Sequence, residues 1–152
     1  MKKYFLLTTI LFTISSCNKF NNKNNSLPSL TPQDLYQEAI NSFEKQDYRK
    51  ASDEFEKLFF NYPGHNLTIK SELMQAYSLY KAERYVEAED VIDIFIKLHP
   101  RDKYIDYAYY LRANIYYSQI NSYDLDNSIM YRAQEGFNDL INRFPYTSTL
   151  PQ

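Results

Sequence analysis

The sequence has 152 residues, of which 44% are hydrophobic and 24% are charged, a composition typical of a single globular domain. Its 2 glycines leave little room for Gly-rich phosphate loops or hairpin-rich β folds, and a formal net charge of −2 argues against nucleic-acid binding by bulk electrostatics. The 1 Cys and 2 His cannot form a closed Cys/His zinc site. Because the G-x-S-x-G, H-E-x-x-H and P-loop motifs are also absent, we expect neither an enzyme nor a bound metal or cofactor.

The N-terminal 16 residues have the pattern of a bacterial lipoprotein signal peptide. Lys2 and Lys3 precede an apolar run at 4–14 that is too short for a membrane-spanning helix, and two serines lead to Cys17, the only cysteine. We expect cleavage before Cys17 and a covalent lipid of the palmitate type on its thiol. The alternative is an ordinary signal peptide followed by an incidental cysteine. Asn18, rather than Asp, follows the cysteine, which favours anchoring in the outer membrane with the domain on the periplasmic face.

The mature chain divides into a tether, a domain and a tail. Residues 17–31 are rich in Asn, Ser, Lys and Pro and contain little that can pack, so we expect a lipidated flexible tether there. The folded domain is expected over 32–147 and a short tail over 148–152.

Three segments of this domain share one spacing of alanine and proline. In the first two segments an Ala is followed after about a dozen residues by a second Ala, and after about a dozen more by a Pro. The positions are Ala39, Ala51 and Pro63, then Ala76, Ala88 and Pro100, then Ala113, Ala133 and Pro145, with an insertion at 118–127 in the third. Small residues let two antiparallel helices approach closely, and Pro ends the second helix. The spacing predicts an all-α fold of tetratricopeptide-like hairpins, stacked as a short right-handed solenoid of about three repeats.

The same pattern places the helix ends. Six helices are predicted, at about 32–45, 48–61, 66–82, 85–98, 103–119 and 127–143. Thr31 is expected to cap the first helix, with Pro32 at its first position, and Asp102 to cap the fifth. Because no polar capping helix follows it, the sixth helix would expose Phe137 and Leu140 unless it turns them inward.

The candidate binding surface is aromatic, since the chain has 16 Tyr and 10 Phe. In stacked hairpins the first helices line a concave face, where Tyr combines a broad apolar contact with a polar handle. The repeat frame predicts a peptide-binding trough made of Tyr36, Ile40, Phe43, Leu73, Tyr77, Tyr80, Tyr107, Tyr110, Asn114 and Tyr117. Lys70 and Lys81 flank it and could meet a carboxylate. The alternative for part of this set is packing between adjacent repeats.

Three stretches resemble the BamD family of outer-membrane assembly lipoproteins. They are YQEAINSFEKQDYRKASDEFEKLFFNYP at 36–63, AYSLYKAERYVEAEDVIDIFIKLHP at 76–100 and IDYAYYLRA at 105–113. The resemblance implies an adaptor of the β-barrel assembly machinery (BAM complex) that is anchored to the outer membrane. It also implies that the trough residues bind unfolded outer-membrane protein segments that end in an aromatic residue.

The resemblance also bears on partners. Family members usually carry five repeats, and the later ones contact the BamA-type barrel subunit, whereas we find three in this sequence. We therefore expect a chain that is C-terminally short, as a fragment, a truncated product or a short paralogue. Contact with BamA and other assembly subunits stays open on this ground, and a nucleic-acid partner is not expected.

Two other functions remain as alternatives. One is a periplasmic repeat scaffold of the Tol-associated or cell-division type, although no heptad run precedes Leu35. The other is an envelope enzyme on a helical scaffold, such as a lytic glycosidase, which would need an isolated carboxylate in a deep pocket.

Overall fold

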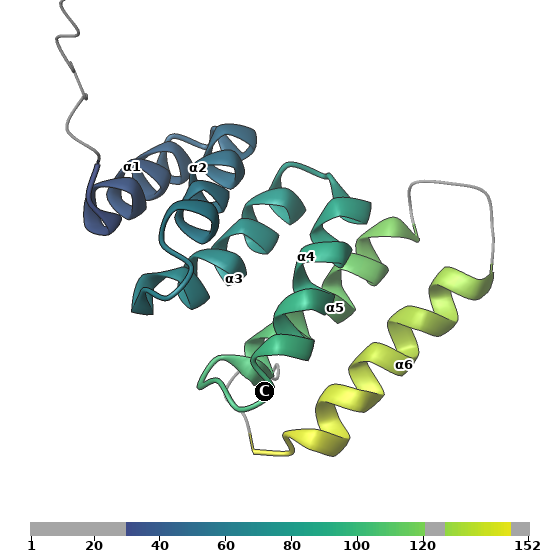
Figure 1. Ribbon diagram of the computed structural model, residues 1–152. Coiled ribbons are helices and arrows are strands. Elements are labelled where there is room, and N and C mark those ends of the chain that lie inside the picture. Colours follow the sequence, from purple (N-terminus) through teal and green to yellow (C-terminus); the bar gives the residue numbers. More distant parts are fainter. Residues whose placement is uncertain (1–29, 121–126, 147–152) are drawn as a thin grey trace, which may run out of the picture.

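The computed structural model describes residues 30–120 and 127–146, which form six α-helices and no strand (Figure 1). The helices are α1 (Pro32–Glu44), α2 (Tyr48–Asn61), α3 (Asn66–Lys81), α4 (Tyr85–Leu98), α5 (Ile105–Gln119) and α6 (Asn127–Arg143). Each helix end lies within two residues of its predicted position. The expected signal peptide, Cys17, the tether before residue 30 and the tail lie outside the described residues.

Local sequence explains where the helices begin. Thr31 caps α1 as predicted: its hydroxyl accepts the backbone N–H of Asp34, whose carboxylate accepts the backbone N–H of Thr31. The expected cap of α5 by Asp102 is wrong. Asp102 Oδ1 accepts from the backbone N of Tyr104 at 2.8 Å, which closes the loop before the helix, so Tyr104 becomes the N-cap residue without a side-chain cap bond.

The first two hairpins use the same inner turn. Gln46 and Glu83 adopt positive φ angles of 62° and 60°, just after the ends of α1 and α3. In each turn the following backbone N–H, of Asp47 or Arg84, then bonds back to a carbonyl near the end of the first helix. This repeated turn makes the second helix of each hairpin double back along the first.

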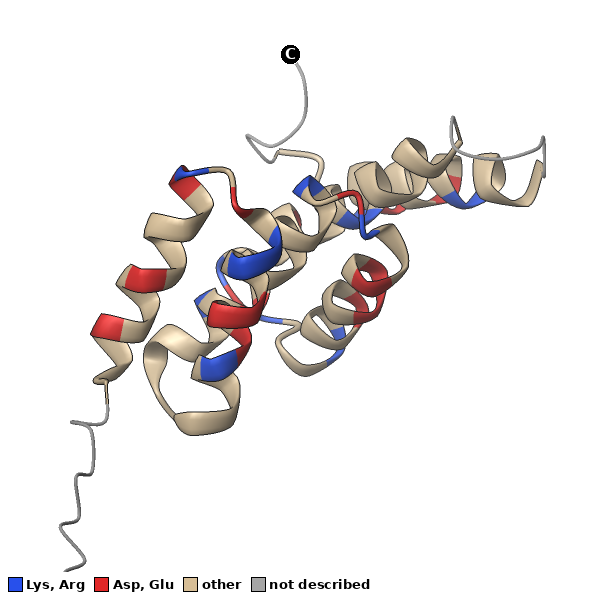
Figure 2. Cartoon of the chain, turned by 90° about the horizontal axis from the view of Figure 1, so that it is seen from above, with Lys and Arg blue, Asp and Glu red and all other residues tan. Residues whose placement is uncertain are grey.

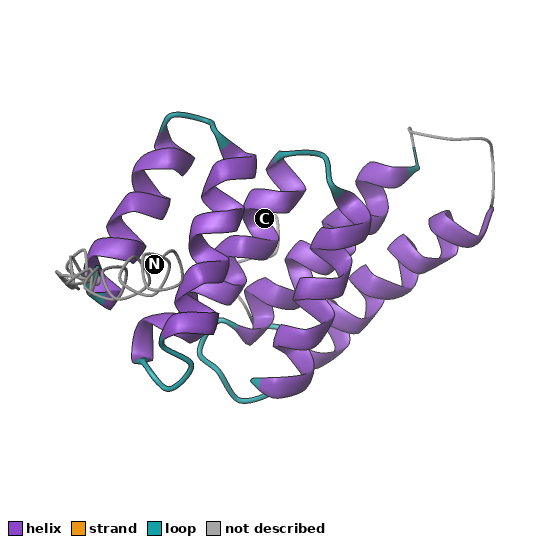
Figure 3. Ribbon diagram, turned by 45° about the horizontal axis from the view of Figure 1, so that its top comes forward, coloured by secondary structure: helices purple, strands orange, loops and turns teal. Residues whose placement is uncertain are grey.

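Consecutive helices pack against each other, and α1, α3 and α5 also contact one another in that order. Figure 3 shows the helices stacked side by side in sequence order, which confirms the prediction of a tetratricopeptide-like helical solenoid. The alanines of the repeat pattern occupy the helix crossings, where Ala39, Ala51, Ala76, Ala88, Ala113 and Ala133 are all buried. Phe55 and Ile92, one turn after the second alanine of their hairpins, fill the core beside these crossings.

The sequence left two orientations open for α6, and the structure shows the inward one. Leu140 is 0% exposed and Phe137 is half-buried, so the helix turns its apolar face inward. Gly136 makes this possible, because a Cβ there would lie 3.2 Å from the Cβ of Ala113 on α5. Ala133, Gly136 and Leu140 therefore form one stripe along the buried side of α6. None of the helices among the described residues is both long and apolar enough to cross a membrane.

Candidate functional site

A continuous set of aromatic rings runs across α1, α3 and α5. The rings of Phe43 on α1 and Tyr77 on α3 lie 5.4 Å apart, and Tyr77 meets Tyr107 on α5 edge-on at 6.3 Å. Tyr80 stacks on Tyr77 at 6.2 Å, and Tyr110 lies 6.2 Å from Tyr107. We call these five residues the aromatic surface. Its ring pairs join three helices that are far apart in sequence, so the surface exists only in the stacked repeats.

A cavity of about 460 Å³ opens beside this surface, between α3 and the start of α5. Tyr77 and Tyr107 form one wall, and Met74 and Tyr104 contribute further apolar lining. The charged residues of the lining are Lys70, Lys103 and Asp106, two cations and one carboxylate. The Lys70 ammonium lies 5.1 Å from the ring centre of Tyr36. The Lys103 ammonium lies 4.7 Å from the ring centre of Tyr104. The cavity can therefore take a large apolar side chain with a negative group beside it.

The pKa values of Tyr107 and Lys70, two residues that line the cavity, are both raised by their surroundings. Burial, reinforced by the neighbouring phenols of Tyr77, Tyr110 and Tyr80, raises the pKa of Tyr107 to about 12. A hydrogen bond to Tyr36 raises the pKa of Lys70, so its ammonium is held in the charged form. At neutral pH the cavity thus presents the neutral hydroxyl of Tyr107 and the ammonium of Lys70, and Lys103 and Asp106 add one charge of each sign to its lining.

The predicted trough residues divide into those that meet and those that do not. Phe43, Tyr77, Tyr80, Tyr107 and Tyr110 come together in the aromatic surface. Tyr36 and Ile40 are half-buried and pack against the core cluster of the first hairpin, where the Tyr36 ring contacts Phe55 at 5.7 Å.

The remaining three lie apart from the rings. Leu73 is only 6% exposed and belongs mainly to the core, although part of it reaches the cavity. The Asn114 amide donates to the backbone carbonyl of Tyr110 at 2.8 Å. Tyr117 is exposed, and its ring lies 6.5 Å from Phe137 on α6.

Several residues of this site escaped the sequence analysis. Met74 lies one position after Leu73 and lines the cavity, so the helical frame was correct to within one residue. The predicted helix at 103–119 includes Lys103 and Tyr104, but they stand in the loop before α5, so the helical frame does not describe their orientation. Tyr48 on α2 extends the row of rings beyond α1, because its ring lies 5.1 Å from that of Phe43. The Lys81 ammonium lies 5.6 Å from the centre of the Tyr48 ring.

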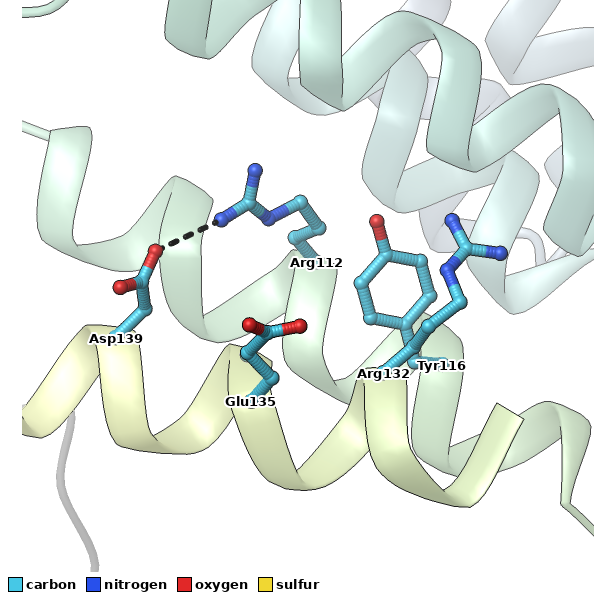
Figure 4. A pocket seen from close by; sticks show the side chains of 6 residues that line it. Arg112, Tyr116, Arg132, Glu135 and Asp139 are labelled. Carbon is cyan, nitrogen blue, oxygen red and sulfur yellow. Dashed lines mark ion pairs between the residues drawn. The ribbon is translucent and has the colours of Figure 1, made fainter. Parts of the chain in front are cut away.

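A second cavity, of about 210 Å³, lies between α5 and α6 and is lined by charged groups (Figure 4). Arg112 pairs with Asp139 at 3.7 Å and with Asp93 of α4 at 3.3 Å. Arg132 pairs with Glu89 of α4, and its guanidinium lies 4.2 Å from the ring centre of Tyr116. These pairs tie α4, α5 and α6 together, which indicates a structural role.

The buried carboxylates have partners of their own. Glu54 accepts from the Ser42 hydroxyl at 2.6 Å and lies 3.6 Å from the Lys50 ammonium. Glu72 lies 2.9 Å from Nε2 of His99 and connects α3 to the end of α4. Within the described part of the chain, no group of three or more His, Cys, Asp or Glu could hold a metal ion.

Comparison with known proteins places this geometry in context. Residues 28–149 match the YfiO family, described as an outer membrane lipoprotein. A curated protein of Rickettsia prowazekii is 39% identical over 150 residues, which cover 97% of this chain and 59% of that protein. One of Caulobacter vibrioides is 29% identical over 74% of this chain and 37% of its own length. One of Neisseria meningitidis serogroup B is 27% identical over 95% of this chain and 59% of its own length. All three bear the name outer membrane protein assembly factor BamD, and this chain is shorter than each of them.

Proposed function

Because the chain belongs to the YfiO family of outer membrane lipoproteins, we propose that it is a non-enzymatic adaptor in outer-membrane protein assembly. In this role it binds unfolded segments of outer-membrane proteins at the aromatic surface and its cavity. The observation that carries the proposal is the run of rings from Phe43 through Tyr77 to Tyr107, with the cavity beside it. Partner subunits of the BAM complex, including a BamA-type barrel protein, belong to the same proposal.

The chemistry of the surface suits an extended segment with aromatic side chains. Such a segment can place a ring against Tyr77 and Tyr107, where ring pairs add to the gain from apolar burial. Tyr hydroxyls can bond the backbone of a segment that has no secondary structure of its own. Lys70 and Lys103 favour a carboxylate at the same place, so a chain that ends in an aromatic residue fits both features.

The membrane anchor is a separate part of the proposal. Lipidation at Cys17 would hold the domain at the outer membrane on its periplasmic face, with residues 17–31 as the tether. In cells, Cys17→Ser should move the chain from the membrane fraction to the soluble periplasmic fraction and abolish incorporation of labelled palmitate. A chain that stays in the membrane without the label would contradict this anchor.

Peptide binding provides the main test. A fluorescent peptide that copies the C-terminus of an outer-membrane β-barrel and ends in Phe is titrated into the chain beginning at Asn18. We expect micromolar affinity, weakened about tenfold by Tyr77→Ala or Tyr110→Ala, because each removes a ring from the surface. Tyr131→Ala, an exposed position on α6, is the matched control and should leave the affinity unchanged.

The outcome separates the two main functions. Amidation of the peptide C-terminus should weaken binding as well, since it removes the carboxylate that Lys70 and Lys103 would meet. If the folded chain does not bind the peptide at all, the aromatic surface is not a recognition site. The periplasmic scaffold of the Tol-associated or cell-division type then becomes the better explanation.

A further inference from the structure

A groove lies on the side of the second helices of the hairpins. The helices α2 and α4 both pack against α3 but not against each other, so α3 forms the floor between them. Two cavities of about 220 Å³ and 210 Å³ lie there and share Glu56, Gln75 and Val91 in their lining. The two cavities therefore adjoin, and we call them together the α2–α4 groove.

One end of the groove is apolar. Phe59 and Phe60 of α2 and Ile94 of α4 line it, and the two Phe rings contact each other at 5.4 Å. The buried Glu72 of α3 also lines this end, where it pairs with His99. Phe60 is 69% exposed and Ile94 is 53% exposed. Leu98, one turn after Ile94 on α4, is 57% exposed and extends the apolar strip. Large apolar side chains gathered on a surface in this way mark interaction sites.

The other end is acidic. Asp53 and Glu56 of α2 face Glu87 and Asp90 of α4 around a single cation, Arg84, which pairs with Glu87. Among the described residues, no ion pair joins Asp53, Glu56 or Asp90 to a basic side chain. The other two acidic residues of α4, Glu89 and Asp93, pair with Arg132 and Arg112 and do not line the groove. Figure 2 shows how the acidic and basic residues are distributed over the helices.

The acidic and apolar ends have a fixed order. Asp53 lies in the N-terminal half of α2, as Glu87 and Asp90 do in α4, and the exposed apolar residues lie in the C-terminal halves. Glu56, just past the middle of α2, borders both ends. Along α4 the strip from Glu87 to Leu98 measures about 16 Å, the length of about three helical turns. A ligand that fits the whole groove needs basic groups at one end and large apolar groups at the other.

We propose that the α2–α4 groove docks an amphipathic helix of a partner protein, with lysines or arginines at one end and large apolar side chains at the other. Charge complementarity favours this occupant: the carboxylates would repel nucleic acid and anionic lipid but attract a basic segment. The aromatic surface has the opposite preference, since Lys70 and Lys103 line its cavity. The chain would thus carry two binding surfaces selective for different ligands.

The test uses a designed peptide as the probe. A fluorescein-labelled helix of about three turns carries lysines at one end and Leu and Phe at the other, and binding to the chain from Asn18 is followed by anisotropy. We expect micromolar affinity, and about tenfold weaker binding by the Glu56→Lys, Asp90→Lys double variant. A second peptide with Glu in place of every Lys should bind the unchanged chain weakly and this double variant more tightly.

Three controls locate the binding. The Glu38→Lys, Glu44→Lys double variant makes the same charge change at exposed positions of α1 and should leave the affinity unchanged. Phe60→Ser should weaken binding several-fold through the apolar end, whereas Tyr77→Ala on the aromatic surface should not affect it. This last variant also separates the present proposal from the proposed function.

Several results would overturn the proposal. Equal weakening by both double variants would mean that net charge alone draws the peptide. Loss of binding in Tyr77→Ala would place the peptide on the aromatic surface. If the free chain self-associates in sedimentation and Phe60→Ser abolishes that association, the groove is an interface between copies of this chain.

Discussion

Gly136 sets the closest approach between α5 and α6, and an added methyl group tests it. A Cβ at this position would lie 3.2 Å from the Cβ and 3.3 Å from the Cα of Ala113, inside the normal contact distance of about 3.5–4.0 Å. In an unhindered helix, Gly→Ala stabilises by about 1 kcal/mol. Forcing an extra methyl into a well-packed interface costs about 2 kcal/mol. We therefore expect Gly136→Ala to lower the free energy of unfolding by about 1 kcal/mol.

The assay is urea unfolding followed by far-UV circular dichroism on the chain from Asn18. The matched control is Gly64→Ala: no atom lies within 4 Å of a Cβ placed there, so we expect no loss and a gain of up to about 1 kcal/mol. A domain of this size should lose about 4 °C in melting temperature for each kcal/mol, which gives a second measurement of the same effect.

A second substitution separates crowding from helix propensity. In an Ala113→Gly background the nearest obstructing atom is gone but the backbone Cα at 3.3 Å remains, so the same Gly136→Ala change should cost less than in the unaltered chain. The size of the loss thus depends on the partner residue. If Gly136→Ala stabilises the unaltered chain by the full propensity difference, the close approach of α5 and α6 is wrong.

Three further substitutions test other parts of the fold. Thr31→Ala should lower the unfolding free energy by about 1 kcal/mol, because the capping bond to the Asp34 backbone is lost; urea unfolding measures it, and no change would contradict the capping box. Leu140→Ala should lower the unfolding free energy by about 3 kcal/mol in the same assay, because Leu140 is fully buried. Ile141 is half-exposed at the next position, so Ile141→Ala should lower it by under about 0.5 kcal/mol. Equal effects would contradict the orientation of α6. The pKa of Tyr107 is about 12 in the folded chain, above its ordinary value of 10.0, so the unfolded state releases this proton first. Stability should therefore be intact below about pH 10 and fall as the pH approaches about 12, and Tyr107→Phe should make that fall shallower in urea titrations across this range.

Residue spacing alone predicted most of the fold. The alanines mark helix crossings and the prolines mark helix ends, and both effects are local steric rules that act wherever the residues occur. The N-terminus of α5 did not follow a local rule, because Asp102 bonds to the loop backbone at Tyr104 instead of to the helix. The inward rotation of α6 depends on the contact between Gly136 and Ala113, a tertiary feature that neither residue reveals alone.

The candidate site was less accessible from sequence. A helical frame selected aromatic residues on the first helices of the hairpins but could not decide which rings meet. One residue in a helix turns the side chain by about 100°. Leu73 therefore lies mainly in the core and reaches the cavity only in part, whereas the neighbouring Met74 is half-buried and lines the cavity. Lys103 and Tyr104 reach the cavity from a loop that the sequence predicts to be the start of the fifth helix, so helical periodicity misplaces their side chains.

The position of α3 links the two proposed surfaces. Tyr77 and Met74 on one side of this helix line the cavity beside the aromatic surface, whereas Gln75 on the other side lines the α2–α4 groove. Between them Ala76 is fully buried at the crossing with its neighbours, so the helix has little freedom to shift when either surface is occupied. Because α3 packs on both sides in this way, we expect ligands at the two surfaces to bind independently. A change in the affinity of the basic helical peptide upon saturation with the aromatic-ended peptide would show instead that α3 moves.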